Sequence, residues 1–298
     1  MPRHPSPLPP ELHGRAFAVA DVRSDLSARR LAASDLWSPT RGVRLPEWAR
    51  DLRSRCIAHA VTLPPQAAFS HTTACSAHAL PLPLGLARDA RIHATVPKGV
   101  RAPRRKGFVG HQRPLPEEDV IESAGLRLTS LSRTFVDLAE ILDLTALVAV
   151  GDRMLWRGDP KLDRAALERA VAAMSGGRGS RKAARALELL DDGAESPKES
   201  ELRLLLLDAG FGPFASNVEL HDRGGSFVAR VDLALPGLRI AIEYEGDHHR
   251  DSEQWRKDVA RRRRIEALGW IYIAVTQADL KNPRGLLADL GSAIVARG

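Results

Sequence analysis

The stretch from Ser226 to Glu245 constrains the fold most, because apolar and polar residues alternate there in two runs separated by Pro236-Gly237. A period of two is typical of β-strands, whose successive side chains point to opposite faces. Residues 226–235 and 238–245 are therefore predicted to be strands joined by a tight turn. In the second strand, one face carries Leu238, Ile240, Ile242 and Tyr244, and the other carries Arg239, Ala241, Glu243 and Glu245. In the first strand, the residues sharing a face are Val228, Arg230, Asp232 and Ala234.

Three carboxylates become candidate functional residues if these strands pair, because Asp232 then lies beside the face of Glu243 and Glu245. Crowded carboxylates repel one another and need a counter-charge. Hard oxygen ligands in this number suit Mg²⁺ or Mn²⁺, and such an ion activates water and stabilises charge on a phosphate. The alternative is a solvated polar sheet face on which Arg230 and Arg239 are the salt-bridge partners. Spacing alone does not choose between the two.

A helix and a further strand are predicted before these two strands. Ser196 is a helix cap, Pro197 takes the first helical position and Glu199 completes a capping box. The predicted helix ends at Gly210, and residues 214–220 form the first strand of this region. The fold predicted for residues 195–298 is thus an α/β domain.

Three runs in this region carry a family resemblance. They are Ser196-Pro-Lys-Glu-Ser-Glu-Leu-Arg203, Arg230-Val-Asp-Leu-Ala-Leu-Pro236 and Ile242-Glu-Tyr-Glu-Gly-Asp-His-His-Arg250, in that order. They closely resemble an uncharacterised bacterial family related to very-short-patch-repair endonucleases, within the PD-(D/E)XK nuclease superfamily. The resemblance covers roughly residues 195–280. It includes Trp255, Asp258 and Arg261 on the helix after the site, and Gly269-Trp270 before the last strand.

The resemblance implies a role for each matching residue. Asp232 would be the metal-bridging aspartate and Glu243 the second acidic ligand, so these two would hold Mg²⁺ or Mn²⁺. Glu199 resembles the helical glutamate that often completes the acidic site, and capping accounts for it as well. Glu245 stands where the superfamily usually has lysine, which leaves open the group that orients the water. His249 would contact the scissile phosphate or act as a general acid.

The N-terminal part reads as helix, helix and β-ribbon, the outline of a winged helix-turn-helix that places its second helix in the major groove. The alternative is a structural cap on the next domain. The runs Phe69-Ser-His-Thr-Thr-Ala and Leu128-Thr-Ser-Leu-Ser-Arg-Thr-Phe-Val-Asp-Leu-Ala139 loosely resemble abortive-infection antitoxins, which carry a winged-helix region. Residues 91–96 and 107–112 are predicted strands. The cations between them, Lys98, Arg101, Arg104, Arg105 and Lys106, either grip phosphates or belong to a solvated hairpin loop.

Charge is divided unevenly along the chain, whose net charge is +7 and whose pI is about 9.9. Residues 195–298 contain 15 Lys+Arg against 16 Asp+Glu, whereas residues 1–194 contain 29 against 21. The basic excess therefore lies outside the acidic cluster, as suits a basic DNA-holding part joined to a metal-binding part. Two cysteines are too few for a disulfide framework, and the sequence has no signal-peptide or membrane-spanning pattern, so we expect a cytoplasmic protein.

These features together predict an α+β multidomain protein. Its expected parts are a winged helix-turn-helix-like region at 1–62, an α/β middle domain at 63–160, a helical linker at 161–194 and a restriction-endonuclease-like α/β domain at 195–298. The expected function is metal-dependent DNA endonuclease, with DNA as the partner, no membrane partner, and a homodimer left open. The alternatives are a DNA-binding transcriptional regulator or antitoxin-like protein with an inactive nuclease-like domain, and a nuclease acting on RNA.

Overall fold

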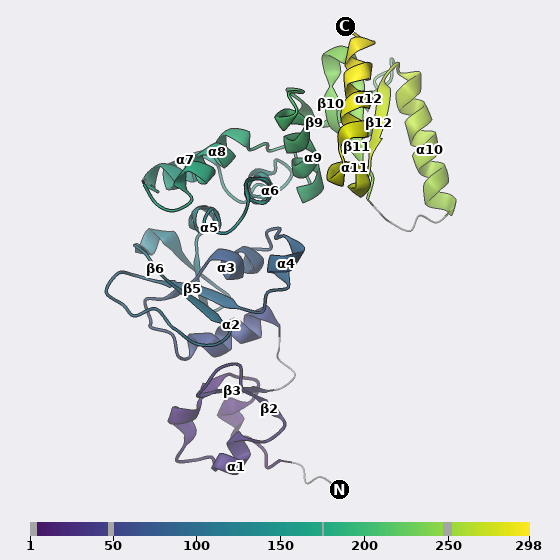
Figure 1. Ribbon diagram of the computed structural model, residues 1–298. Coiled ribbons are helices and arrows are strands. Elements are labelled where there is room, and N and C mark those ends of the chain that lie inside the picture. The colour runs from purple at the N-terminus through teal and green to yellow at the C-terminus, as the bar shows by residue number, and fades with distance from the viewer. Residues whose placement is uncertain (1–4, 47–50, 175, 247–251) are drawn as a thin grey trace. The chain divides into compact units, whose positions relative to one another are not determined.

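Two compact units make up the chain, residues 1–140 and residues 141–298, and Figure 1 shows their elements in chain order. The computed structural model describes residues 5–46, 51–174, 176–246 and 252–298. Helices and several sheets occur together, so the expected α+β multidomain class is confirmed at that level. None of the helices in the described ranges has the length and apolar character needed to span a bilayer.

The first unit begins with short elements. In chain order they are the 3-10 helix η1 (Pro10–Leu12), β1 (Phe17–Ala18), the 3-10 helix η2 (Val19–Val22), α1 (Ala28–Leu31), β2 (Leu36–Trp37) and β3 (Val43–Pro46). The predicted helix, helix and ribbon correspond to η2, α1 and the pair of β2 and β3, whereas β1 was not predicted and joins the same sheet. Ser27 caps α1 by accepting a hydrogen bond from the backbone N of Arg30. The strands form an antiparallel sheet in the order β1-β3-β2, and Phe17, Val22 and Leu31 form the core beneath it.

A second sheet follows in the order β6-β5-β4-β8-β7. Its strands are β4 (Ala68–Phe69), β5 (Ile92–Val96), β6 (Phe108–Gln112), β7 (Val120–Ser123) and β8 (Leu126–Thr129). The accompanying helices are α2 (Leu52–Ala60), α3 (His71–Ala77), α4 (Leu84–Ala87) and α5 (Leu131–Leu138). β5 and β6 pair in parallel, so the basic segment 97–107 is a crossover between parallel strands and the hairpin interpretation is wrong.

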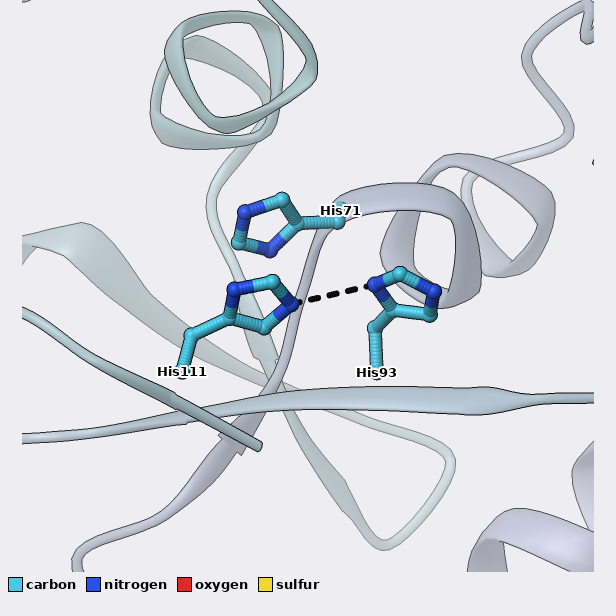
Figure 2. A group of neighbouring side chains, drawn as sticks. All are labelled: His71, His93 and His111. Carbon is cyan, nitrogen blue, oxygen red and sulfur yellow. Dashed lines mark hydrogen bonds between the residues drawn. The ribbon is translucent and has the colours of Figure 1, made fainter. Parts of the chain in front are cut away.

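The two faces of β5 differ in chemistry. Ile92 and Ala94 pack in a cluster with Cys56 of α2. The opposite face carries buried polar side chains, and there His93 and His111 of β6 meet His71 of α3 (Figure 2). This alternation is the period-two pattern of a strand buried on both sides.

Helices α6 (Leu144–Leu155), α7 (Arg164–Ala173), α8 (Ser180–Leu189) and α9 (Pro197–Asp208) open the second unit. Residues 161–194, expected as a helical linker, contain the helices α7 and α8 and belong to this unit, where α8 packs against α6 and α7. Asp152 of α6 explains the packing, because its buried carboxylate accepts hydrogen bonds from Arg203 Nη2 at 2.9 Å and Ser200 Oγ at 2.7 Å, and from the backbone N of Asp191 at 2.7 Å. A buried carboxylate with a paired cation and two further donors is fully compensated, so it ties the helices together.

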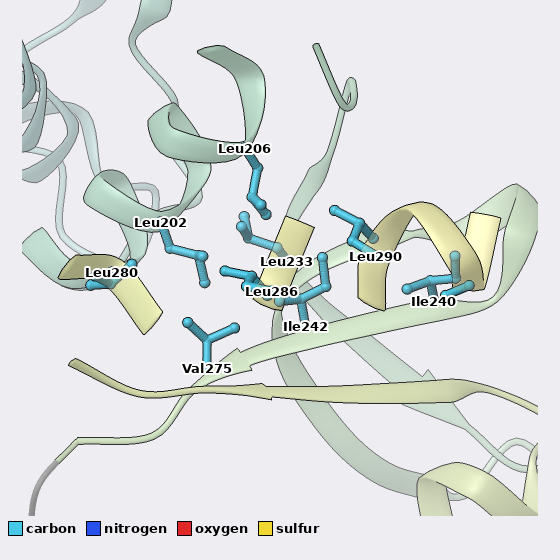
Figure 3. Close-up of a cluster of buried hydrophobic side chains, with 10 residues drawn as sticks. Leu202, Leu206, Leu233, Ile240, Ile242, Val275, Leu280, Leu286 and Leu290 are labelled. Atoms are coloured by element: carbon cyan, nitrogen blue, oxygen red, sulfur yellow. The ribbon is translucent and has the colours of Figure 1, made fainter. Parts of the chain in front are cut away.

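The sheet of the second unit has the order β12-β11-β10-β9, with β12 parallel to β11 and the other pairs antiparallel. Its strands are β9 (Ala215–His221), β10 (Phe227–Leu235), β11 (Ile240–Tyr244) and β12 (Ile271–Val275). Helix α10 (Ser252–Ala267) covers one face, and Ile265 packs there against Ala241 and Val231. On the other face α9, α11 (Gln277–Lys281) and α12 (Arg284–Val295) bury Leu233, Ile240 and Ile242 (Figure 3).

Candidate functional site

Asp232 and Glu243 lie opposite one another on β10 and β11. The strands pair Leu233 with Ile242, and continuing this antiparallel register by one residue places the two acids side by side. The Asp232 carboxylate also reaches across the seam, because its Oδ2 accepts a hydrogen bond from the backbone N of Tyr244 at 2.7 Å. The predicted adjacency of these two acids is therefore present.

Along β10, the odd-numbered side chains point to one face of the sheet before Asp232 and to the opposite face after it. Val231 packs in the cluster under α10, Leu233 packs in the cluster under α9 and α12, and Ala234 returns to the α10 side. Residues two apart on a regular strand share a face, so the prediction that Val228, Arg230, Asp232 and Ala234 share one face is wrong. The physical reason lies on β9, where Asn217 has a φ of +52° at the position that would face Asp232. This left-handed residue turns the strand locally.

Glu243 is buried and held from α10. Arg261 donates to both of its carboxylate oxygens, from Nη2 at 2.6 Å and from Nη1 at 2.9 Å. The hydroxyl of Tyr272 on β12 donates to Glu243 Oε2 at 2.9 Å. Burial raises the pKa of Glu243, while the Arg261 charge opposes that rise. The positively charged guanidinium of Arg261 thus lies beside Glu243 and neutralises its carboxylate.

Glu199 enters the site from the first turn of α9, where it is buried. Its Oε2 accepts hydrogen bonds from the backbone N of Glu195 at 2.8 Å and from Asn217 Nδ2 at 2.7 Å. Ser196 caps the helix as predicted. In a capping box, the Glu199 carboxylate would accept a hydrogen bond from the backbone N of Ser196. Here it accepts one from the backbone N of Glu195 instead, one residue before the cap.

Burial dominates the electrostatics of Asp232. It raises the pKa of Asp232 to about 7, the hydrogen bond from Tyr244 opposes the rise, and the charges of Glu199 and Glu243 add to it. The charges of Glu199 on α9 and Glu243 on β11 thus both act on Asp232 of β10, although the three carboxylates are less tightly gathered than the ligand atoms of a preformed metal site. Among the described residues, the histidines of Figure 2 are the group whose possible ligand atoms all lie within 4.8 Å of one another.

The remaining predicted site residues are Glu245 and His249. Glu245 follows the end of β11, and its Oε1 accepts a hydrogen bond from the Tyr272 hydroxyl at 3.2 Å. Glu243 and Glu245 therefore share one tyrosine, which confirms that they point to the same side of the strand. His249 lies outside the described residues.

An open cavity of about 380 Å³ adjoins the acidic site. It is lined by Trp156, Arg157, Gly158, Glu195, Asn217, Glu219 and Arg230. Asn217 connects the two features, because it lines the cavity and its Nδ2 donates a hydrogen bond to Glu199 Oε2 at 2.7 Å. Sequence patterns did not indicate Asn217, Tyr272 or the cavity, since each depends on contacts between distant elements.

Comparison with known proteins places the chain among bacterial relatives. Two proteins of Mycobacterium tuberculosis, from strains CDC 1551 and H37Rv and both described as uncharacterized, are each 32% identical to it over 198 residues. The match covers 66% of this chain and 71% of each relative. The chain belongs to the family of these mycobacterial proteins. No protein-family model matches the sequence, and no solved structure matches it.

Proposed function

We propose that this protein is a metal-dependent DNA endonuclease whose chemistry resides in the second unit. The observation that carries the proposal is the juxtaposition of Asp232 and Glu243 on neighbouring strands, with Glu199 close enough to raise the pKa of Asp232. Buried acids that repel one another lower stability unless a cation compensates them. Such a cost is typical of a functional site, where stability is lost in exchange for activity.

The donor set fits Mg²⁺ or Mn²⁺, which prefer carboxylate oxygens. Asp232 and Glu243 would hold the ion, and the bound ion would supply an activated water and neutralise charge on the phosphate. Glu199 would orient Asp232 from the α9 side, fixed by its bonds to Asn217 and the Glu195 amide. Glu245, which contacts Tyr272, would stand where the PD-(D/E)XK nucleases that the sequence resembles usually carry lysine.

Arg261 has a second role in this proposal. Its bidentate bond to Glu243 balances that carboxylate before an ion binds. Because Arg261 also donates to the carbonyl of Arg230, it remains anchored if Glu243 turns toward an ion. The freed guanidinium then faces the site as a contact for a phosphate oxygen.

The DNA-holding surface is proposed to be in the first unit, which carries basic charge in excess. Four cations of the 97–107 crossover are exposed: Lys98, Arg101, Arg104 and Lys106. We call them the crossover cations. Arg105 differs from them, because it donates to Thr62 Oγ1 at 2.7 Å and lies 5.0 Å from the centre of the Phe108 ring. Exposed guanidinium and ammonium groups on one loop can contact successive phosphates. Arg105 is not counted with them, because its guanidinium already contacts Thr62 and Phe108.

A DNA-binding regulator with a silent nuclease domain is the second candidate. It is favoured by one observation, the Arg261 guanidinium that already neutralises Glu243. A cytoplasmic location is part of both proposals, and Cys56 and Cys75, which are buried and unpaired, suit a reducing compartment.

The test is a substrate panel. The full chain is incubated with duplex DNA, single-stranded DNA and RNA, each with Mg²⁺, with Mn²⁺ or with EDTA. Cutting of DNA that stops in EDTA supports the endonuclease. Cutting confined to RNA assigns the same chemistry to another substrate, and sequence-selective DNA binding without cutting under any metal favours the regulator.

A further inference from the structure

A second polar centre lies in the first unit, apart from the acidic residues. His93 of β5 and His111 of β6 lie on adjacent parallel strands, and His71 is the first residue of α3. Their side chains converge in Figure 2, and one possible ligand atom from each lies within 4.8 Å of the other two. His93 Nδ1 and His111 Nε2 are 3.1 Å apart.

All three imidazoles are held neutral. Burial lowers the pKa of His71 to about 2 and that of His93 to about 4, with the neighbouring histidines adding to the effect. Burial also lowers the pKa of His111, with the charge of Glu140 opposing and that of Arg113 assisting. A neutral imidazole has one ring nitrogen with a free lone pair, which is the form that binds metal ions.

A buried carboxylate that is paired through only one of its oxygens adjoins this centre. Asp137 of α5 is buried, and its Oδ1 accepts a hydrogen bond from Arg133 Nε at 2.9 Å. Within the described part of the chain, Asp137 Oδ2 has no hydrogen-bond partner and lies 3.9 Å from His71 Nδ1. A buried oxygen without a partner calls for an explanation, and a bound ion, an ordered water, stored strain and a catalytic role are the usual ones. A carboxylate behind a histidine is also the usual outer partner of a metal-binding imidazole.

The backbone of His71 supports the same interpretation. Its φ is +50°, in the left-handed region that residues other than glycine seldom adopt. Strained backbone of this kind concentrates at ligand clamps and active sites, where surrounding structure holds it in place. Here the Ser70 hydroxyl contacts His71 Nδ1 at 2.9 Å and accepts a bond from Thr95 Oγ1 at 2.8 Å.

We propose that His71, His93 and His111 bind one divalent transition-metal ion, Zn²⁺ by preference, with Asp137 as the outer carboxylate. Two nitrogens bound to a tetrahedral zinc at 2.0–2.1 Å lie about 3.3 Å apart, close to the 3.1 Å between His93 and His111. The site would join α3 to both strands. Three neutral imidazoles exclude Mg²⁺ as the preferred ion, because Mg²⁺ selects oxygen ligands.

Binding requires a tautomer change and one movement. The tautomer must change because the hydrogen bond between His93 Nδ1 and His111 Nε2 places a proton on one of these two nitrogens. The His71 ring stacks on that of His111, with centroids 3.6 Å apart and planes 14° apart. Lone pairs lie in the ring planes, so those of stacked rings run parallel and do not converge on one point. The His71 ring must therefore turn before its lone pair and those of His93 and His111 point at one ion. Asp137 Oδ2 lies 3.9 Å from His71 Nδ1, and it would serve as the acceptor for the His71 ring nitrogen that does not bind the ion.

The experiment is a Co²⁺ titration of the tag-free full chain, read by visible absorption, with Zn²⁺ competition to give the affinity. The Asp232→Asn background removes the acidic site as a source of signal. One equivalent of Co²⁺ should give the intense bands of a nitrogen-rich tetrahedral site, and His111→Gln should weaken binding at least 100-fold. Asp137→Asn should weaken it 10- to 100-fold.

His59→Gln is the matched control, because His59 is a buried histidine of the same unit that packs on Phe108. It should bind Co²⁺ as the parent does. Circular dichroism of His111→Gln establishes that the variant is folded, and a folded variant that binds Co²⁺ like the parent overturns the proposal. Absence of tetrahedral Co²⁺ bands in the parent overturns it as well and assigns the histidines to a hydrogen-bonded chain without metal. None of these results depends on nuclease activity.

Discussion

Replacing Asp232 with Asn should stabilise the metal-free protein at neutral pH, although we propose that it abolishes cutting. The Asn side chain keeps an oxygen that can accept the hydrogen bond from Tyr244. It removes a carboxylate whose pKa is raised from 3.8 to about 7, first by burial and then by Glu199 and Glu243. A raised pKa means that the folded chain holds its proton at pH values where the unfolded chain has lost it.

The magnitude and its pH dependence follow from that shift. Each pKa unit corresponds to about 1.4 kcal/mol, so the full difference is roughly 4 kcal/mol, and about 2 to 4 is expected for a half-buried group. Well below pH 3.8 the carboxyl is protonated in both states, and the two proteins should be equally stable. As pH rises from 4 to about 7, wild-type stability falls and that of Asp232→Asn does not. Above pH 7 the gap should be constant.

The difference in free energy of unfolding between wild type and Asp232→Asn can be measured in the second unit alone, by hydrogen exchange of β10 and β11 peptides across a urea series. The comparison is made in EDTA at pH 4.5 and pH 8, with Asp289→Asn on an exposed position of α12 as the control. Adding Mg²⁺ at one hundred times its Kd should stabilise wild type by about 2.7 kcal/mol and the variant far less. If this stability difference is absent at pH 8, or is equal at pH 4.5 and pH 8, burial of the Asp232 carboxylate does not destabilise the protein and the reasoning is refuted.

Three further outcomes are expected. Asp152→Ala removes the closer of the two carboxylates that pair with the buried Arg203 guanidinium and leaves Asp191 at 3.7 Å, so the free energy of unfolding in urea should fall by about 3 kcal/mol, whereas a loss below about 1 kcal/mol would contradict the network. Glu199→Gln keeps an acceptor for Asn217, so single-turnover cleavage should slow less than in Asp232→Asn, and an equal loss would make Glu199 a direct ligand. Changing the four crossover cations to Gln should weaken DNA binding and lower the slope of log affinity against log salt by roughly 0.9 per lost phosphate contact; an unchanged slope, with Lys281→Gln as the control, would exclude that loop.

Local patterns predicted the elements that carry the acidic site. Alternation predicted β10 and β11 within a few residues of their observed ends, and the cap at Ser196 predicted the start of α9. These signals are local, because side-chain direction in a strand and capping of a helix depend on neighbours in sequence. The adjacency of Asp232 and Glu243 followed, since a short turn between the two strands nearly fixes their register.

Contacts between segments that are far apart in the sequence could not be predicted from local sequence patterns. The face reversal at Asp232 depends on Asn217 of another strand, and the parallel pairing of β5 with β6 depends on the whole sheet. The helical packing of 161–194 rests on Asp152, which meets its partners only after folding. The three histidines share no motif, because they come from separate elements.

The most direct test of the nuclease proposal is the single-turnover rate of DNA cleavage by wild type and by Asp232→Asn, measured in Mg²⁺ and in EDTA with the full chain. The proposal predicts metal-dependent cutting by wild type and a loss of roughly three orders of magnitude or more in the variant, since the ion supplies the activated water. DNA binding, measured by fluorescence anisotropy in the same samples, should persist. Cutting by Asp232→Asn at the wild-type rate would contradict the placement of the chemistry at β10 and β11.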